Sequence, residues 1–247
     1  MLDNPPQNRI DRRMADELST AVDTIGSSDA RAVIVRAEGP DFSFGGDIVP
    51  WPDWNQRELR SAFEHYMTTF NKFEQLPLPV IAAVHGLCAG GGFELAVRAD
   101  VIIAAESARF AHPEQTLGIV TLLGGIYRVA ERAGRARAAE WALTSEQVPA
   151  AVMAESGVIN RVVPDEALLA EVTAFANKVA KGPTRAHAAH KALLRAWAIG
   201  GVAVADQAMF DIALPLFETE DVQGALVSAV DAFKAGRPRP VFGFEGR

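Results

Sequence analysis

Two glutamates in apolar surroundings are the residues whose type and spacing best suit chemistry. Glu94 lies inside residues 80–105, a largely apolar stretch, two residues after the last of three consecutive glycines. Glu114 lies between two other apolar runs. A carboxylate beside apolar side chains tends to have a raised pKa and can exchange protons near neutrality. Two carboxylates beside one water suit the addition of water to a double bond: one takes a proton from the water, and the other gives one to the carbon alpha to a carbonyl.

Each glutamate also has a purely structural interpretation. Glu94 and Arg98 are four residues apart, which on a helix gives an ordinary ion pair, although their neighbours leave little polar face for it. Glu114 is expected in a loop, where a glutamate is more often solvated. The residue types alone therefore leave open whether either glutamate is functional.

The glycines Gly46 and Gly91 are candidates for binding a negatively charged oxygen. Consecutive glycines allow the backbone to turn sharply and to approach a ligand closely. A helix that opens at Gly91 points free N–H groups and the positive end of its dipole at that ligand. Gly46, in the segment FSFGGDI, can supply a second N–H to the same oxygen. This segment does not open a helix after a strand, so a dinucleotide site is excluded.

Alternating helices and strands are expected to position these residues. Amphipathic patterns predict helices over residues 11–25, 56–75, 127–133, 135–143 and 165–180. Short apolar runs predict strands over residues 31–37, 108–111 and 156–163. Residues 80–105 are predicted to form a strand, a glycine turn, a short helix and a second strand. The alternation indicates an α/β fold with parallel strands and crossover helices.

Gly182 and Pro183 mark the predicted boundary between residues 1–182 and residues 183–247. Beyond this boundary the sequence predicts three helices, over residues 184–197, 202–217 and 219–235, and then an extended tail. These helices are apolar but too few to form a core of their own. We expect them to pack on the main domain or on another subunit.

The composition of the chain argues against several classes of function and location. The net charge of −7 argues against binding to nucleic acid or to anionic membranes. No uninterrupted apolar run reaches the ~18 residues of a membrane helix, and the first residues lack the apolar segment of a secretory signal. The single cysteine excludes an internal disulfide, and the histidines form no ligand set, so neither a metal nor a cofactor is expected. A cytoplasmic location is therefore expected.

Four segments of the chain resemble the enoyl-CoA hydratase/isomerase (crotonase) family. They are LDNPPQNRID, FSFGGDI, VHGLCAGGGFELAVRADVIIAAESARFAHPE and FKAGRPRPVF, and together the resemblance covers nearly the whole chain. It implies a crotonase-like spiral of ββα turns with a C-terminal helical region that mediates homotrimers or dimers of trimers. It also implies an acyl-CoA thioester substrate, with coenzyme A present only as part of that substrate.

The resemblance assigns roles to the candidate residues. Gly46 and Gly91 match the positions whose backbone N–H groups form the oxyanion hole. Glu94 would help to activate the water, and Glu114 would protonate the alpha carbon. Because hydratase members have glutamate at both positions, the expected reaction is hydration of a 2-enoyl-CoA to a 3-hydroxyacyl-CoA, as in fatty acid metabolism. The alternatives are an isomerase that uses Glu114 alone and a non-catalytic relative that binds CoA esters or RNA.

The chain departs from the family pattern around the expected substrate site. Phe44 stands where the family has a smaller residue, and Gly46 stands where it has a larger one. Gly236 stands where lysine is frequent, so contacts to the CoA phosphates are expected to be fewer. Thr121, Leu122 and Leu123 replace Pro-Gly-Ala in the loop that borders the acyl pocket. The residues expected to bind substrate are Phe44, Asp47, Ile48, Trp51, Leu122 and Gly124. The sequence does not identify the acyl group.

Overall fold

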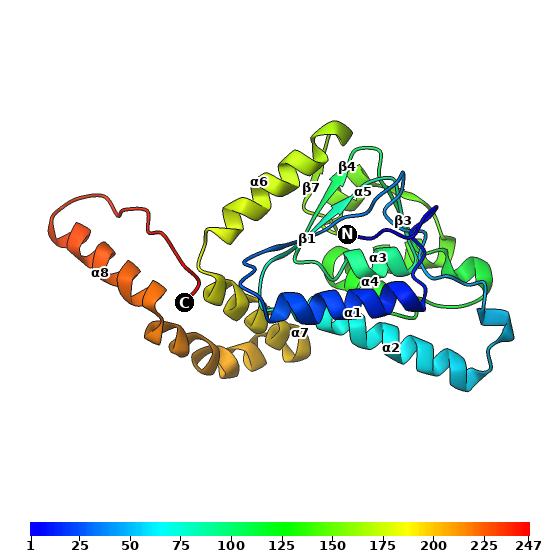
Figure 1. Ribbon diagram of the computed structural model, residues 1–247, viewed down its shortest axis with the longest axis horizontal. Coiled ribbons are helices and arrows are strands. Elements are labelled where there is room, and N and C mark those ends of the chain that lie inside the picture. Colours follow the sequence, from blue (N-terminus) through cyan, green and yellow to red (C-terminus); the bar gives the residue numbers. More distant parts are fainter. The chain divides into compact units, whose positions relative to one another are not determined.

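The computed structural model describes residues 1–247 and divides them into two compact units. The first unit consists of Met1–Ser28, Ile34–Leu76 and Val80–Ala174. The second consists of Asp29–Val33, Pro77–Pro79 and Phe175–Arg247. Figure 1 labels the α-helices and several of the strands.

Four strands form a sheet in the order β1-β2-β4-β7, with β1 at Val33–Val35, β2 at Val80–Val84, β4 at Val101–Ala105 and β7 at Arg161–Val163. The pairs β2–β4 and β4–β7 are parallel, which confirms the prediction of parallel strands. Every residue of β2 is buried, as expected for a strand covered on both faces.

A second sheet has the order β3-β5-β6, with β3 at Leu87–Ala89, β5 at Arg109–Ala111 and β6 at Val148–Pro149. Strands β3 and β5 are parallel, while β5 and β6 are antiparallel. The sequence did not separate β3 from β2. Gly86 ends the apolar run between them at φ +56°, and a Cβ there would lie 2.1 Å from the carbonyl oxygen of Pro40.

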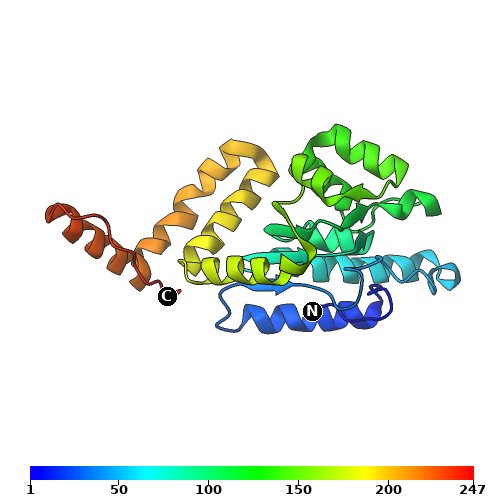
Figure 2. The ribbon, with the colours of Figure 1, turned by 90° about the horizontal axis from the view of Figure 1, so that it is seen from above.

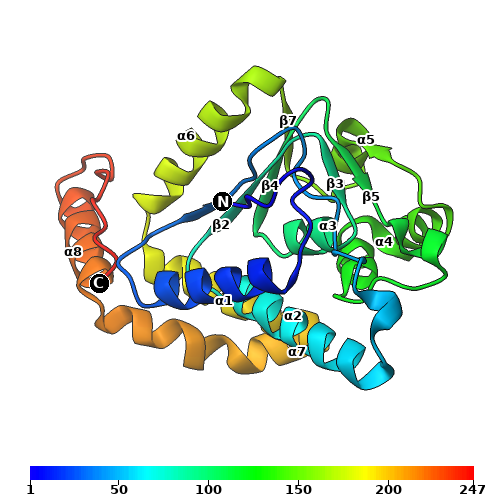
Figure 3. The ribbon, with the colours of Figure 1, turned by 45° about the vertical axis from the view of Figure 1, so that its right-hand side comes forward.

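The first unit contains the helices α1 at Arg12–Gly26, α2 at Gln56–Glu74, α3 at Gly91–Ala96, α4 at Gly125–Thr144 and α5 at Ala150–Glu155. Helix α1 packs along α2, and α3 lies beside β3 and α4 (Figure 3). Asp11 caps α1, and Asn55 with Glu58 forms a capping box at α2, so both predicted starts are confirmed. Gly134, at φ 80° and ψ 159°, divides α4 into the two helices that the sequence predicted.

The predicted strand over residues 156–163 is wrong in its first half. Only Arg161–Val163 is strand, because the short helix α5 ends at Glu155 and residues 156–160 form the turn that follows it. Gly157 then turns the chain at φ +81°. Val158 and Ile159 are buried, as in a strand, but they lie in this turn.

The second unit is largely helical. Helix α6 at Leu168–Ala180 runs into it, followed by α7 at Thr184–Ala213 and α8 at Glu220–Lys234. Gly200 and Gly201 leave helical geometry inside α7, so the three predicted helices are confirmed (Figure 2). The Arg31 guanidinium binds the tail by donating to the carbonyl of Phe244 at 2.8 Å and to that of Gly182 at 2.6 Å.

Helix α7 and the short 3-10 helix that follows it expose much apolar surface. By length and composition alone, Thr184–Glu218 is long and apolar enough to cross a membrane, with a mean hydropathy of 1.3 over its most apolar window. This differs from the sequence expectation, which considered only uninterrupted apolar runs. The exposed large apolar side chains of this stretch are Leu194, Trp197, Ile199, Val202, Met209, Phe210, Leu214 and Phe217.

Candidate active site

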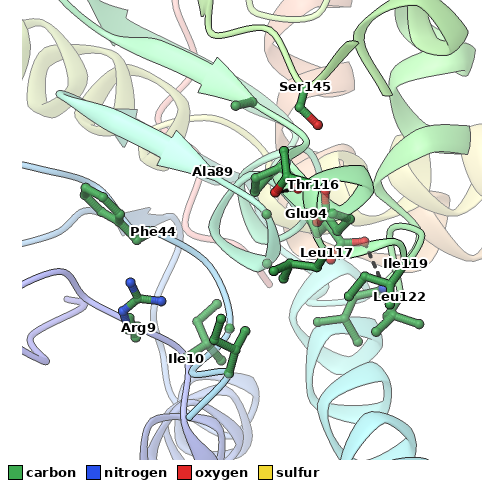
Figure 4. Close-up of a pocket in the computed structure, with 18 of the residues that line it drawn as sticks. Arg9, Ile10, Phe44, Ala89, Glu94, Thr116, Leu117, Ile119, Leu122 and Ser145 are labelled. Atoms are coloured by element: carbon green, nitrogen blue, oxygen red, sulfur yellow. Dashed lines mark hydrogen bonds between the residues drawn. The ribbon is translucent and has the colours of Figure 1, made fainter. Parts of the chain in front are cut away.

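A pocket of about 310 Å³ in the first unit brings most of the predicted site residues together. Its wall comes from the start of the chain, the loop after β1, helix α2, the segment from β3 into α3, and the segment from β5 to α4. Figure 4 shows Arg9 and Phe44 on one side of it, and Glu94 with Leu117 and Leu122 on the other. The predicted residues that line it are Phe44, Gly46, Ile48, Trp51, Gly91, Glu94, Glu114 and Leu122.

Two predicted substrate-binding residues, Asp47 and Gly124, do not line the pocket. The Asp47 carboxylate accepts a hydrogen bond from the N–H of Val49 at 3.3 Å, and so supports the turn after Gly46. Gly124 precedes α4 at φ +85°, and a Cβ there would lie 2.1 Å from the Tyr127 hydroxyl. Both residues shape the backbone beside the pocket instead of contacting its contents.

The two candidate oxyanion-hole glycines lie against each other. Gly90 turns the chain at φ +49° and ψ −127°, and α3 begins at Gly91, whose N–H therefore has no partner within the helix. A Cβ on Gly91 would lie 3.5 Å from the nitrogen of Gly46. The backbone of Gly46 therefore lies against the first residue of α3, and both glycines line the same pocket.

The loop that carries Gly46 is fixed by hydrogen bonds to the first residues of the chain. The N–H of Ile10 donates to the carbonyl of Gly45 at 2.8 Å, and the N–H of Asp47 donates to the carbonyl of Ile10 at 3.1 Å. The Ser43 hydroxyl donates to the carbonyl of Asn8 at 2.7 Å and accepts from the N–H of Gly45 at 3.1 Å. The position of Gly46 is therefore set before any ligand binds.

Glu94 is held inside the protein by backbone groups of a distant segment. Its side chain belongs to α3, and the residue is only 3% exposed. Its Oε1 accepts from the N–H of Leu123 at 2.8 Å and from that of Gly125 at 2.9 Å. Burial raises the pKa of Glu94, while these two N–H groups and the charges of Arg98 and Arg128 act in the opposite direction.

The ion pair expected between Glu94 and Arg98 from their spacing is wrong. Helix α3 ends at Ala96, so the i, i+4 geometry is lost before Arg98. The Arg98 guanidinium is fully buried and instead binds the carboxylate of Glu74 at 2.8 Å. Glu94 thus lacks the partner that would have made it an ordinary surface residue.

Glu114 has the more strongly perturbed carboxyl group. It lies in the 3-10 helix Pro113–Leu117, and its side chain is 12% exposed. Burial raises the pKa of Glu114 to about 7, opposed by a backbone hydrogen bond and assisted by the charge of Glu94. Its Oε2 is buried and has no hydrogen-bond partner. This carboxyl group is close to half-protonated at neutral pH and can both give and take a proton.

His112 is a neighbour of Glu114 to which the sequence assigned no role. It is 1% exposed, and its ring packs on Phe93 at 4.8 Å between centroids. Burial lowers the pKa of His112 to about 4, so the ring is neutral at physiological pH. Its Nδ1 lies 3.9 Å from Glu114 Oε2, and this contact is therefore not an ion pair. Nowhere do three or more His, Cys, Asp or Glu side chains gather as metal ligands would.

Arg9 is a pocket residue that the sequence reasoning missed. Among the charged side chains that line the pocket it is the one cation, beside Glu94 and Glu114. Its guanidinium lies 5.9 Å from the centre of the Phe44 ring, and its Nε donates to Gln7 at 2.9 Å. Arg9 stands within one of the four family-like segments, but only the fold shows that this segment borders the pocket.

Trp51 explains the glycine at position 46. Its ring packs edge-on against Phe63, 5.2 Å between centroids, and lines the pocket. A Cβ on Gly46 would lie 3.0 Å from Trp51 Cζ2, closer than side chains normally approach. An alanine at this position would therefore require the indole to shift by a few tenths of an ångström.

Comparisons with known proteins identify the family of the chain. The family model for enoyl-CoA hydratase/isomerase matches residues 1–236. A probable enoyl-CoA hydratase of Mycobacterium bovis is 33% identical over 198 residues, which are 78% of this chain and 76% of that protein. A mevalonyl-coenzyme A hydratase of Aspergillus fumigatus is 31% identical over 179 residues, 72% of this chain and 66% of that protein.

The fold is also shared with solved structures. A crystal structure of an enoyl-CoA hydratase from Bacillus anthracis superimposes with a TM-score of 0.87 at 29% identity, covering 98% of this chain and 92% of that one. The predicted crotonase-like α/β fold with a C-terminal helical region is therefore confirmed. This chain is an enzyme, and it belongs to the enoyl-CoA hydratase/isomerase family.

Proposed function

We propose that this enzyme hydrates a 2-enoyl-CoA thioester to the 3-hydroxyacyl-CoA. The observation that carries the proposal is that Glu94 and Glu114 line one pocket together with Gly46 and Gly91. Hydration uses both carboxylates, whereas moving a double bond requires only one. The names of the relatives support the same reaction.

In the proposed reaction the thioester carbonyl oxygen lies between the N–H groups of Gly46 and Gly91. These donors stabilise the negative charge that develops on this oxygen as a water adds to the beta carbon. Glu94 takes a proton from that water, and Glu114 gives its proton to the alpha carbon. The products are the 3-hydroxyacyl thioester, a protonated Glu94 and an ionised Glu114, and exchange with solvent restores the two carboxyl groups.

The surroundings of the two glutamates favour this division of roles. Burial raises the pKa of Glu94, but two N–H donors and two arginine charges oppose this rise and favour the ionised form. Glu114, whose pKa is raised to about 7, retains its proton over much of the neutral range. Pairs of carboxyl groups whose environments differ in this way commonly act as base and acid.

Arg9 supports a substrate that carries phosphate. Coenzyme A has several phosphate groups, and the protein as a whole is acidic, with a net charge of −7. Arg9 places a cation on the side of the pocket away from Glu94 (Figure 4). We assign it to the phosphates of the CoA moiety, where the chain has Gly236 in place of the frequent lysine.

The test is the loss of absorbance of the conjugated thioester of crotonyl-CoA, extended to longer and to aryl 2-enoyl-CoAs. Wild-type enzyme is expected to consume at least one of them. Glu94→Gln and Glu114→Gln are each expected to lower kcat by about 10²–10⁴-fold, the usual contribution of a general acid or base. The control is Glu64→Gln, which makes the same chemical change at an exposed residue of α2. Absence of hydration across the whole panel contradicts the proposal.

Isomerisation of an enoyl-CoA is the second candidate, and the state of Glu114 favours it. One carboxyl group whose pKa is about 7 and whose Oε2 has no partner can carry a proton between two carbons. Glu94→Gln separates the two reactions. An isomerase would retain most of its conversion of 3-enoyl-CoA to 2-enoyl-CoA in this variant, while a hydratase would lose most of its hydration.

We also propose that the enzyme assembles as a homotrimer or a dimer of trimers in the cytoplasm. The support is the row of exposed apolar side chains on α7 and α8, including Phe210 at 69% exposed and Phe233 at 85%. Large exposed apolar patches mark surfaces that another partner covers. A second copy of this chain is the partner that would cover them, and membrane binding is the competing outcome of the same test.

A further inference from the structure

Arg98, Arg128 and Glu74 form a cluster of ion pairs next to the segment that holds Glu94. Arg98 Nη1 lies 2.8 Å from Glu74 Oε2, and Arg128 Nη2 lies 2.5 Å from the same oxygen. Arg128 Nε also donates to Glu74 Oε1 at 2.8 Å. The Arg98 side chain is fully buried, so solvent does not screen it.

Both arginines also bind the segment that holds Glu94. Arg98 Nη2 donates to the carbonyl of Leu123 at 2.7 Å, and Arg128 Nη1 donates to that of Gly124 at 3.2 Å. The carbonyl of Gly124 shares its peptide group with the N–H of Gly125, one of the two donors to Glu94. A cation on the oxygen of a peptide group polarises its N–H, so hydrogen bonds in such a chain strengthen one another.

The charges of the cluster are unequal. Glu74 carries one negative charge, whereas Arg98 and Arg128 together carry two positive charges. An ionised Glu94 supplies the missing negative charge across residues 123–125. A buried charge without compensation is costly, so the excess charge favours the ionised form of Glu94.

We propose that Arg98, together with Glu74 and Arg128, is a positioning group that holds Glu94 as an oriented carboxylate through residues 123–125. The role of Arg98 in catalysis rests on the proposed hydration. Its effect on the ionisation of Glu94 is independent of which reaction the enzyme catalyses. The titratable groups around Glu94 are Arg98, Glu74, Arg128, Tyr127, His112 and Glu114.

The first test is direct titration of the Glu94 carboxyl group by carbon NMR, with Glu94→Gln to assign the signal. In Arg98→Met the titration midpoint of Glu94 is expected to rise by about one pH unit, because the variant removes a cation and loosens the two N–H donors. Arg60→Met is the matched control, since Arg60 pairs with Glu64 at an exposed site on α2. An unchanged midpoint in Arg98→Met overturns the proposal, whether or not the enzyme hydrates anything.

The second test uses turnover. If Glu94 is the base, Arg98→Met is expected to lower kcat by roughly 10–100-fold, to leave KM within about threefold, and to move the acidic limb of the pH profile upwards. A purely structural role would lower the melting temperature without moving that limb. Arg98→Lys retains the charge and is expected to restore part of both effects.

Arg128→Gln keeps the test open if Arg98→Met fails to fold. The Arg128 side chain is 15% exposed, so its removal leaves a smaller buried defect. The same upward movement of the Glu94 midpoint is expected, and its absence in a folded Arg128→Gln protein overturns the proposal. If the wild type has no hydratase activity but the Glu94 midpoint is higher in the arginine variants than in the wild type, only the proposed function is refuted.

Discussion

At the scale of single residues, Glu94 and Glu114 differ in what surrounds their oxygens. Glu94 Oε1 accepts two backbone hydrogen bonds, while Glu114 Oε2 is buried without any. Burial raises the pKa of both carboxyl groups, but at Glu94 two N–H donors and two arginine charges oppose the rise. This contrast, more than the presence of two glutamates, supports an assignment of base and acid.

The raised pKa of Glu114 has a consequence for stability. Between about pH 4.5 and about 7 the folded protein retains a proton that the unfolded chain releases, so this group lowers the stability as the pH rises through that window. Because Gln cannot ionise, Glu114→Gln is expected to lack this pH-dependent decrease in the free energy of unfolding. The raised pKa implies a decrease of roughly 2–3 kcal/mol in the wild type between pH 5 and pH 8. Urea unfolding of wild type and variant at pH 5 and pH 8 measures it.

His112 makes the comparison between variants necessary. Its lowered pKa acts in the opposite sense and increases the stability as the pH rises from about 4 to its ordinary value. The wild-type curve alone therefore mixes both groups, whereas the difference between wild type and Glu114→Gln isolates the carboxyl. Equal pH dependence of the two proteins would contradict the buried environment of Glu114.

Trp51 and Gly46 are expected to depend on each other. Gly46→Ala places a methyl group against the indole and is expected to lower the unfolding free energy by roughly 1–2 kcal/mol. Trp51→Phe removes the ring atoms that come nearest, so alanine should be tolerated better in the double variant. A double-mutant cycle on stability and on kcat/KM measures the coupling. Additive effects would mean that the two positions do not compete for the same space.

At the scale of elements, the start of α3 carries Gly91, one of the two glycines of the proposed oxyanion site. Gly91 has helical geometry, and a Cβ there would only touch Ile10 at 3.4 Å and the Gly46 nitrogen at 3.5 Å. Gly91→Ala is therefore expected to fold normally but to lower kcat by about 10²-fold or more, because its methyl group crowds the N–H of Gly46. Thermal unfolding together with steady-state kinetics tests this separation.

Gly92 is the matched comparison. A Cβ there would lie 2.5 Å from Ser43 Cβ, so Gly92→Ala is expected to lower the unfolding free energy by roughly 2–3 kcal/mol. Gly91→Ala is thus expected to affect activity, whereas Gly92→Ala is expected to affect stability. If Gly91→Ala retained full activity, Gly46 and Gly91 would not form the oxyanion site.

The sequence predicts the elements whose signals are local. Periodicity and capping residues place α1, α2 and the two halves of α4 within one or two residues, and the glycine turn before Glu94 is also predicted. Helix α5 escapes prediction because six residues are too few to show a helical period. Arg98 and Glu74 are 24 residues apart, so their pairing depends on the packing of α3 on its neighbours and has no signature in spacing.

At the scale of the whole molecule, every residue that lines the pocket belongs to the first unit. The second unit carries much of the exposed apolar surface. Assembly and chemistry can therefore be altered by different substitutions. Light scattering of wild type is expected to give three or six times the chain mass of 26.5 kDa.

Phe210→Asp is expected to weaken this assembly. An exposed phenylalanine on α7 that becomes buried between copies would act as a hot spot, so the variant is expected to raise the apparent dissociation constant roughly 30-fold or more. Gln56→Asp adds the same charge at an exposed site of the first unit and is the control. A monomeric wild type contradicts the proposed trimer, and its recovery with vesicles would instead indicate a membrane surface.

The hydrogen bonds from Leu123 and Gly125 to Glu94 also connect catalysis to amide exchange. An amide hydrogen bound to a buried carboxylate exchanges with deuterium only when that bond opens. The exchange rates of these two amides therefore report how often their hydrogen bonds to Glu94 open, even when no substrate is present. We expect both amides to exchange faster in Glu94→Gln and in Arg98→Met, while exchange in the buried strand β2 stays unchanged. That result would show that the two amides report local opening of the site.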